Sequence, residues 1–244
     1  MIETGVYHYH EDVNWGLLRL WNKRKGLDVL DVGCGIATTS QYIERMGNRV
    51  VGIDANSDAV VGARQRISRV LQHDVQEVDA ITRELGGLRF DVIIFADMLE
   101  HLPWPVSVLQ QYLPLLKEGG SVFVSLPNFG LWSVRFAHLF GRFEYQETGV
   151  LDRTHLRFFT RSSAARMLEE SGLRIVDRTY NPGLVRPFVP VAKKLFGGDD
   201  DPAALMQSPA YKLYLNLVHP IERVVARLWP GMLAFQMVFE AKRE

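Results

Sequence analysis

The stretch VLDVGCGIATTS, residues 29–40, decides the fold because an apolar run ends there in a turn that contains two glycines. A run of this kind is typical of a strand covered on both faces, and Gly33 and Gly35 follow it directly. Glycines at such a turn let backbone N–H groups approach a ligand without a Cβ in the way. We therefore expect a binding turn at the carboxyl end of this strand, where open parallel sheets hold their ligands.

An acidic side chain closes the next apolar run, RVVGIDA (49–55). Asp54 stands about 20 residues after Gly33, a spacing typical of a carboxylate that binds the two hydroxyls of a ribose. A dinucleotide site would have a third glycine where Thr38 stands, and Asp31 before the turn would repel a diphosphate. The pattern favours a nucleoside that bears an ammonium group.

Seven apolar, β-rich segments are spread along the chain, and the first five alternate with helical stretches. The expected strands are residues 27–33, 49–55, 69–75, 90–97, 121–127, 173–180 and 232–243. Alternation of this kind implies parallel βαβ units. We expect an α/β fold: a doubly wound, Rossmann-like sheet of seven strands, mostly parallel with an antiparallel last strand, and with helices on both faces.

The composition limits the range of partners and compartments. Lys plus Arg and Asp plus Glu number 28 each, so no net field attracts a polyanion, and we expect no nucleic-acid partner. The single cysteine excludes an internal disulfide framework, and the first 15 residues lack the build of a secretory signal. No apolar run approaches the roughly 18 to 20 residues that span a bilayer. We expect a cytoplasmic protein.

Length and patterning indicate a single domain over residues 1–244 with additions to its sheet. Residues 1–26 form a helical lead-in, with a helix expected over 12–22. Residues 129–160 and 181–231 are insertions that we expect to form the acceptor site or a lid.

Two apolar patterns lie in those insertions. Trp132, Phe136, Phe140 and Phe143 recur at near-helical steps, which favours core packing over a lid. Residues 211–229 mix apolar side chains with Arg and Lys, so this segment could contact a membrane surface or a second copy in a homodimer. Packing over the sheet is the commoner outcome for such a segment, and Pro220 is expected to divide it into two helices.

The motif VLDVGCG together with VVGIDAN resembles the class I S-adenosylmethionine-dependent methyltransferases. The resemblance covers roughly residues 7–180 and the last strand, and four segments agree in order and spacing. It implies S-adenosylmethionine as cofactor, with S-adenosylhomocysteine as product. The binding residues it implies are Asp31, Gly33, Cys34, Gly35, Asp54, Ala55, Asp74, Val75, Ala96 and Asp97. Asp74 and Val75 would face the adenine, and Ala96 and Asp97 the methionine portion.

Candidate catalytic residues come from two polar clusters. Glu100 and His101 follow the fourth strand in DMLEH, and Asp152 and His155 lie in LDRTHLRFFT. Methyl transfer needs in-line positioning and, for an acceptor that must lose a proton, a base. We expect a general base here rather than a metal site, although carboxylates and imidazoles could also hold a divalent cation if the clusters met. A structural role for these residues remains the alternative, and Cys34 is expected to be an inert residue of the turn.

The sequence therefore predicts a methyltransferase that acts on an oxygen, or less favourably a nitrogen, of a small-molecule or lipid- or sugar-linked acceptor. The turn LEH is shared with proteins similar to the ubiquinone O-methyltransferases. The alternative is a non-catalytic partner of an acyltransferase, since SLPNFGLWSVRFAHLFGR resembles the MetW proteins of methionine biosynthesis.

Overall fold

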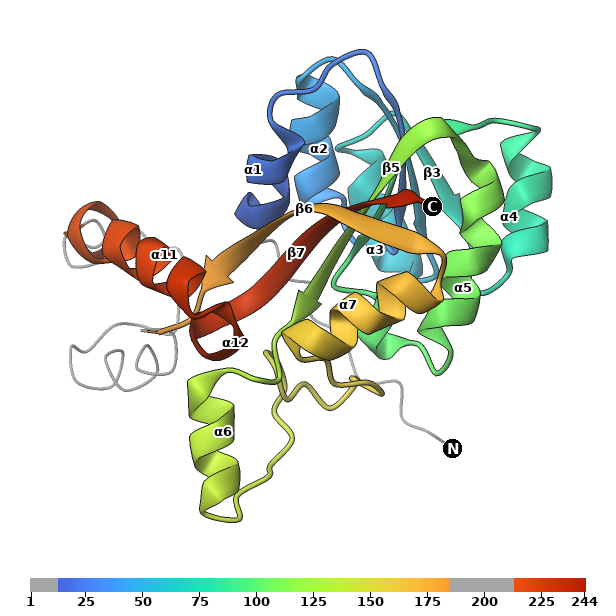
Figure 1. The fold of residues 1–244 in the computed structure, drawn as a ribbon. Coiled ribbons are helices and arrows are strands. Elements are labelled where there is room, and N and C mark those ends of the chain that lie inside the picture. The colour runs from blue at the N-terminus through green and yellow to red at the C-terminus, as the bar shows by residue number, and fades with distance from the viewer. Residues whose placement is uncertain (1–12, 185–212) are drawn as a thin grey trace.

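The computed structural model describes residues 13–184 and 213–244, which form one seven-stranded sheet with helices around it (Figure 1). The strands are β1 (Asp28–Val32), β2 (Arg49–Asp54), β3 (Arg69–Gln72), β4 (Phe90–Ala96), β5 (Leu116–Pro127), β6 (Leu173–Pro182) and β7 (Ala234–Arg243). Their order across the sheet is β3-β2-β1-β4-β5-β7-β6. From β1 the strand order runs to β2 and β3 on one side and to β4 and β5 on the other. Folds of this kind bind ligands at such a switch point, at the carboxyl ends of the strands.

The predicted sheet is confirmed, including its one reversed strand. β1 pairs in parallel with β2 and β4, and β5 pairs in parallel with β4. Only β7, the last strand, runs antiparallel to both of its neighbours, β5 and β6. The carboxyl ends of the six other strands therefore meet at one edge of the sheet, and the site is built there.

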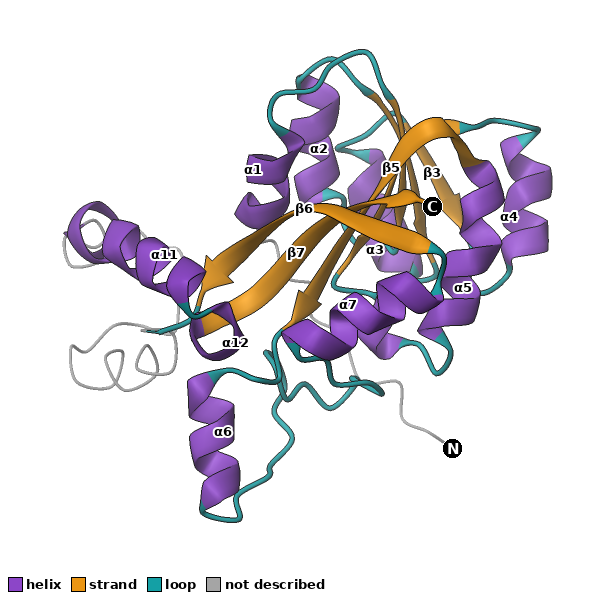
Figure 2. Ribbon diagram, in the orientation of Figure 1, coloured by secondary structure: helices purple, strands orange, loops and turns teal. Residues whose placement is uncertain are grey.

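Helices cover both faces of the sheet (Figure 2). Three helices contribute buried side chains to one face: α1 (Trp15–Trp21), α2 (Thr38–Arg45) and α3 (Ser57–Arg64). Three others pack on the opposite face: α4 (Val78–Leu85), α5 (Pro105–Tyr112) and α7 (Arg161–Glu170). The strand residues between these layers are buried on both sides, which explains why their sequences are apolar without alternation.

The remaining elements are two short helical turns beside α5 and a group that lies beyond the carboxyl ends of β5 and β6. They are η1 (Leu99–His101) and η2 (Leu113–Leu115) beside α5, α6 (Trp132–Leu139) after β5, and three elements before β7: a π-helical turn (Tyr214–Val218), α11 (His219–Leu228) and α12 (Pro230–Leu233). Pro220 lies in the first turn of α11, directly after the π-helical turn, so the helical chain does not break at this proline, contrary to expectation, and changes there from π to α geometry. The buried side chain of Asn128 donates to the carbonyl oxygens of Pro230 and Ala234, which fastens the end of β5 to α12.

The prediction of core packing for the aromatic stripe is wrong for three of its four members, whereas Trp132 is half-buried and packs against a small hydrophobic cluster. Phe136, Phe140 and Phe143 are 58%, 66% and 44% exposed, and only Val134 of α6 is buried. The helix stands outside the sheet layers (Figure 1), so its buried side packs only against a small cluster that includes Leu131. The aromatic side faces outward and forms edge-to-face pairs such as Phe136 with Phe140.

Two helices show well-defined contacts at their first residues. Thr160 is the N-cap of α7, and Ser163 completes the capping box. In α1 the outward side of the helix carries Trp15, which is 56% exposed and packs edge-on against Tyr42.

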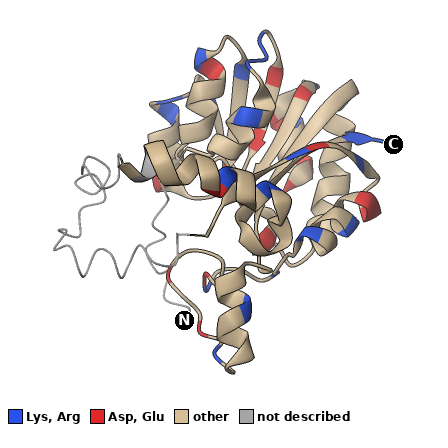
Figure 3. Ribbon diagram, turned by 60° about the vertical axis from the view of Figure 1, so that its left-hand side comes forward, with Lys and Arg blue, Asp and Glu red and all other residues tan. Residues whose placement is uncertain are grey.

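Acidic and basic side chains are interleaved over the described elements (Figure 3). In the described part of the chain, no helix has the length and apolar character needed to cross a bilayer. The first part of the expected lead-in, residues 1–12, and residues 185–212 of the second insertion lie outside the described residues, as do the first two residues of the segment 211–229.

Candidate functional site

The turn after β1 has a conformation that requires glycine. Gly33 and Gly35 have φ values of +75° and +53°. A Cβ on Gly33 would lie 2.5 Å from Cγ of Met98, which follows β4. Both the backbone angle and the contact therefore exclude a side chain at position 33. The glycine holds β1 and the end of β4 close together.

Asp54 organises this turn from the end of β2. Its carboxylate accepts from the N–H of Gly35 at 2.8 Å and from the N–H of Asn56 at 2.9 Å, and the side chain is nearly buried. Ala55, between them, is exposed. The carboxylate thus faces the binding turn, where it can also receive hydroxyl donors.

Asp31 lies inside β1 and carries a buried oxygen that no group satisfies. Ser40 Oγ donates to Oδ2 at 2.6 Å, but Oδ1 has no hydrogen-bond partner. Burial raises the pKa of Asp31 to about 6, and the nearby carboxylate of Asp54 adds to the increase. An orphaned buried carboxylate oxygen beside the glycine turn fits a ligand that brings an ammonium group.

Cys34 is an inert member of the turn, as the sequence indicated. Burial, together with the carboxylates of Asp31 and Asp54, raises the pKa of its thiol well above the usual value. Its Sγ lies 2.7 Å from the position that a Cβ on Gly52 would take, so the thiol packs directly against β2. A thiolate nucleophile is disfavoured here.

The segment after β3 holds the two residues assigned to the adenine. Asp74 is exposed, and its carboxylate accepts from the N–H of Gln76 at 2.9 Å, which closes a local turn. Val75 is half-buried against the core, and its carbonyl oxygen accepts from the hydroxyl of Tyr112 at 2.8 Å. This hydrogen bond from Tyr112 of α5 holds the segment after β3 in position, and the sequence did not predict it.

Asp97 follows Ala96 at the end of β4 with a φ of +50°, a conformation that is uncommon outside glycine. Its N–H donates to the carbonyl oxygen and the hydroxyl of Ser125, both at 3.1 Å. Its carboxylate accepts from Gln236 Nε2 at 2.5 Å and from Asn14 Nδ2 at 3.4 Å. Strained backbone held by several partners is typical of functional positions. Side chains of β5, β7 and the residue before α1 hold Asp97 here.

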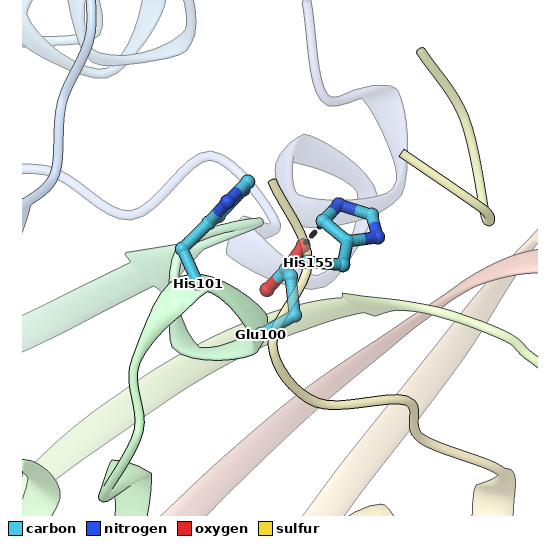
Figure 4. Close-up of side chains that lie close together, drawn as sticks. All are labelled: Glu100, His101 and His155. Atoms are coloured by element: carbon cyan, nitrogen blue, oxygen red, sulfur yellow. Dashed lines mark ion pairs between the residues drawn. The ribbon is translucent and has the colours of Figure 1, made fainter. Parts of the chain in front are cut away.

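Glu100, in the turn after β4, carries a carboxyl group that is buried without hydrogen bonds. The residue is 1% exposed, and neither carboxylate oxygen has a hydrogen-bond partner. Its nearest opposite group is His155, whose Nε2 lies 3.9 Å from Oε1 (Figure 4). Burial raises the pKa of Glu100 well above its usual value, and the carboxylates of Asp97 and Asp152 add to the increase.

Two imidazoles stand beside this carboxyl group. The rings of His101 and His155 meet edge to face with centroids 4.8 Å apart. Burial lowers the pKa of both, and the neighbouring His155 lowers that of His101 further. Both imidazoles are therefore neutral at neutral pH.

A backbone clamp brings the two polar clusters together. The carbonyl oxygen of Glu100 accepts from the N–H groups of Leu156 and Arg157 at 2.9 and 3.0 Å. Asp152 accepts from the hydroxyl of Thr154 at 2.6 Å, and that hydroxyl lies 3.1 Å from Nδ1 of His101. Asp152 thus acts on His101 through Thr154, a residue that the sequence analysis missed.

The same three side chains offer the donors that a divalent cation uses. The ligand atoms of Glu100, His101 and His155 lie within 4.8 Å of one another. Because metal bonds to nitrogen or oxygen are about 2.0–2.2 Å, two donors of one ion lie at most about 4.4 Å apart. The trio would have to contract before all three side chains could bind one ion, so the geometry suits proton exchange better than metal binding.

Comparisons with known proteins agree with this architecture. The family described as "Methyltransferase domain" matches residues 7–178. The ubiquinone biosynthesis O-methyltransferase of Cupriavidus pinatubonensis is 32% identical over 164 residues, which cover 64% of this chain and 65% of that protein. Its counterpart from Nitrosospira multiformis is 31% identical over 163 residues, with 64% and 68% covered. The matches span about two thirds of the length of these curated relatives.

Solved structures share the fold. An S-adenosylmethionine-dependent methyltransferase from Archaeoglobus fulgidus has a TM-score of 0.59 at 19% identity, covering 93% of this chain and 91% of that one. Magnesium protoporphyrin IX methyltransferase from Synechocystis, solved with bound S-adenosylhomocysteine, has a TM-score of 0.56 at 15% identity, covering 93% and 78%. At these identities the likeness concerns the fold.

Proposed function

Because this chain belongs to the methyltransferase-domain family, we propose that it transfers a methyl group to an oxygen of a small-molecule or lipid- or sugar-linked acceptor. S-adenosylmethionine is the cofactor of this reaction. The observation that supports oxygen as the acceptor atom is the cluster of Glu100, His101 and His155 at the carboxyl end of β4.

The turn after β1 would hold the cofactor. Asp54, whose carboxylate faces the glycine turn, would accept from the ribose hydroxyls, and the orphaned oxygen of Asp31 would accept from the ammonium group. Val75 would lie against the adenine and Asp97 near the methionine portion. Bound S-adenosylmethionine supplies a methyl group on a positively charged sulfur, so the chain has to supply orientation, exclusion of water and a base.

His101 is the residue we assign as base. Its Nδ1 is engaged by Thr154, so Nε2 would accept the proton that the acceptor hydroxyl loses as the new C–O bond forms. The lowered pKa keeps the imidazole neutral and able to accept at neutral pH. Asp152 orients the ring through Thr154.

Glu100 and His155 would stabilise the charge that this step creates. A positive charge on His101 would favour the ionised form of the buried Glu100 carboxyl group, and His155, whose Nε2 lies 3.9 Å from Oε1, could take up the proton that Glu100 releases. A protein that only bound the nucleoside would have no use for a buried, unsatisfied carboxyl group. This is why the cluster favours transfer over a MetW-like role as the partner of an acyltransferase.

Relatives that are 31–32% identical and bear the name ubiquinone biosynthesis O-methyltransferase support an oxygen acceptor. The test is release of S-adenosylhomocysteine when the protein is incubated with S-adenosylmethionine and a panel of phenols, alcohols and amines. Turnover restricted to hydroxylated acceptors is expected. Turnover of amines alone, or cofactor binding without turnover together with co-purification of an acyltransferase, would contradict the proposal.

A further inference from the structure

The helix α11 presents its apolar side to solvent, the reverse of an ordinary surface helix. Ile221, Val224 and Leu228 recur at helical spacing and are 65%, 57% and 80% exposed. Leu217, one turn earlier, and Trp229, at the end of the helix, are 60% and 61% exposed. We call Leu217, Ile221, Val224, Leu228 and Trp229 the outer stripe.

The polar side of the same helix faces the protein. Glu222 is 2% exposed and Ala226 is 1% exposed, and His219 Nδ1 lies 3.8 Å from the carboxylate of Glu222. The one acidic side chain of α11 is thus turned inward, away from the outer stripe. The helix packs against β6 at the edge of the sheet, as expected for residues 211–229, but it does so through the side that carries Glu222 and Ala226 and not through its apolar side.

Arginines line one flank of the outer stripe. Arg223 and Arg227 are four residues apart and therefore neighbours on the helix surface. In the described part of the chain neither guanidinium has an ion pair with a carboxylate. Arg19 of α1 lies near both arginines, and its guanidinium donates to the carbonyl oxygen of Tyr180 and to Asn181 Oδ1 while its Nε is buried without a partner. Burial and repulsion by Arg223 and Arg227 lower the pKa of Arg19 to about 10.

The outer stripe and the arginines beside it together indicate what kind of partner binds this surface. Apolar side chains alone would suit a protein partner, and guanidinium groups alone would suit a free phosphate. An apolar stripe flanked by arginines that have no ion pair among the described residues, with the helix carboxylate turned away, matches the boundary between acyl chains and phosphate head groups. Trp229 at the end of the stripe is the residue type enriched at that boundary.

We propose that the outer stripe and the arginines Arg223 and Arg227 bind this protein to the surface of a bilayer that contains anionic lipid. The helix lies in the interface, with Val224 and Leu228 among the acyl chains and both guanidinium groups against phosphates. The proposal of membrane binding rests on residues of α11 and α1, and it does not depend on which acceptor is methylated.

Co-flotation of the full chain with vesicles tests the proposal. Vesicles of phosphatidylcholine with phosphatidylglycerol should bind the protein, and vesicles of phosphatidylcholine alone should bind it much more weakly. Arg223→Gln and Arg227→Gln should each weaken binding by about fivefold at low salt. Val224→Ser combined with Leu228→Ser should abolish binding. Val61→Ser, at a site on α3 that is 58% exposed, is the matched control and should bind as the unaltered protein does.

Affinity for S-adenosylhomocysteine, measured by calorimetry, should be unchanged in every variant, which shows that the fold and the cofactor site survive. The proposal is overturned if the two vesicle types bind equally, or if the α11 variants bind like Val61→Ser. It is also overturned if the unaltered protein ignores vesicles and sediments as a dimer that Val224→Ser with Leu228→Ser converts to a monomer. In that case the stripe is an interface between two copies. Binding of inorganic phosphate without binding of vesicles likewise contradicts a bilayer.

Discussion

Nε2 of His155 lies 3.9 Å from Oε1 of Glu100, although the two residues come from separate segments of the chain. The two side chains are 6% and 1% exposed, so water screens their interaction little. Burial lowers the pKa of His155 and raises that of Glu100, and each group is therefore held in its neutral form. The pair can respond to a proton taken up by the neighbouring imidazole of His101.

Replacement of His101 by Ala should lower kcat by about 10²- to 10⁴-fold, the usual contribution of a general base. Affinity for S-adenosylhomocysteine should stay unchanged. Because burial lowers the pKa of His101 from 6.5, the rate of the unaltered enzyme should rise with pH in the acidic range as the imidazole loses its proton. The rate should have reached its plateau by pH 6.5. His73→Ala, at a more exposed imidazole that pairs with Glu84, is the control. Equal losses of kcat and cofactor affinity would indicate a structural histidine.

Glu100→Gln should make the protein more stable at alkaline pH while lowering its activity. The folded-state pKa of Glu100 is raised by burial, so the carboxyl group favours folding while it is protonated and disfavours it as pH rises and it ionises. The free energy of unfolding of the unaltered protein should therefore fall with pH relative to that of Glu100→Gln. Denaturant titrations of both proteins between pH 5 and pH 9 measure this. A constant difference across that range would show that the carboxyl group does not titrate there.

Asp54→Ala should weaken cofactor binding by about 1 to 3 kcal/mol, the range for removing a partner of buried hydrogen-bonding groups. The loss includes the support that the carboxylate gives to the N–H of Gly35. Asp58→Ala removes an exposed carboxylate in the first turn of α3 and should leave the affinity unchanged. Calorimetry with S-adenosylhomocysteine gives both values, and equal affinities of the two variants would refute the ribose assignment.

The sheet and the glycine turn could be predicted from the sequence because both leave local marks: apolar runs without alternation, and glycines and carboxylates at strand ends. The contact of Glu100 with His155 could not be predicted, because it depends on a backbone clamp between distant segments. For a related reason, the outward-facing aromatic side of α6 was mispredicted and the outward-facing apolar side of α11 was not predicted. Periodicity identifies an apolar side of a helix, but only the tertiary structure decides whether that side meets the core.

Gly33→Ala should destabilise the protein more than Gly26→Ala does. Both glycines have a positive φ, near +75° and +72°, so an added Cβ carries a similar backbone penalty of roughly 1–2 kcal/mol in each. A Cβ at position 26 meets nothing within 4 Å, whereas one at position 33 meets Met98. The difference between the two free energies of unfolding isolates that contact. Adding Met98→Ala to Gly33→Ala should reduce the difference, and an unchanged difference would assign the cost to the backbone alone.

The affinity for S-adenosylhomocysteine should fall as pH drops below 6, because Asp31 takes up a proton there. Its pKa is raised to about 6 by burial, so the carboxylate that would face the ammonium group is ionised above that pH and neutral below it. The same shift, from 3.8 to about 6, corresponds to roughly 3 kcal/mol of folding free energy that is lost as pH rises through this window. Asp31→Asn should therefore bind the ligand weakly at every pH and unfold at higher denaturant concentration above pH 6. Calorimetry and denaturant titrations at pH 5 and pH 7.5 check both outcomes, and a variant that kept the pH-dependent affinity would show that another group binds the ammonium.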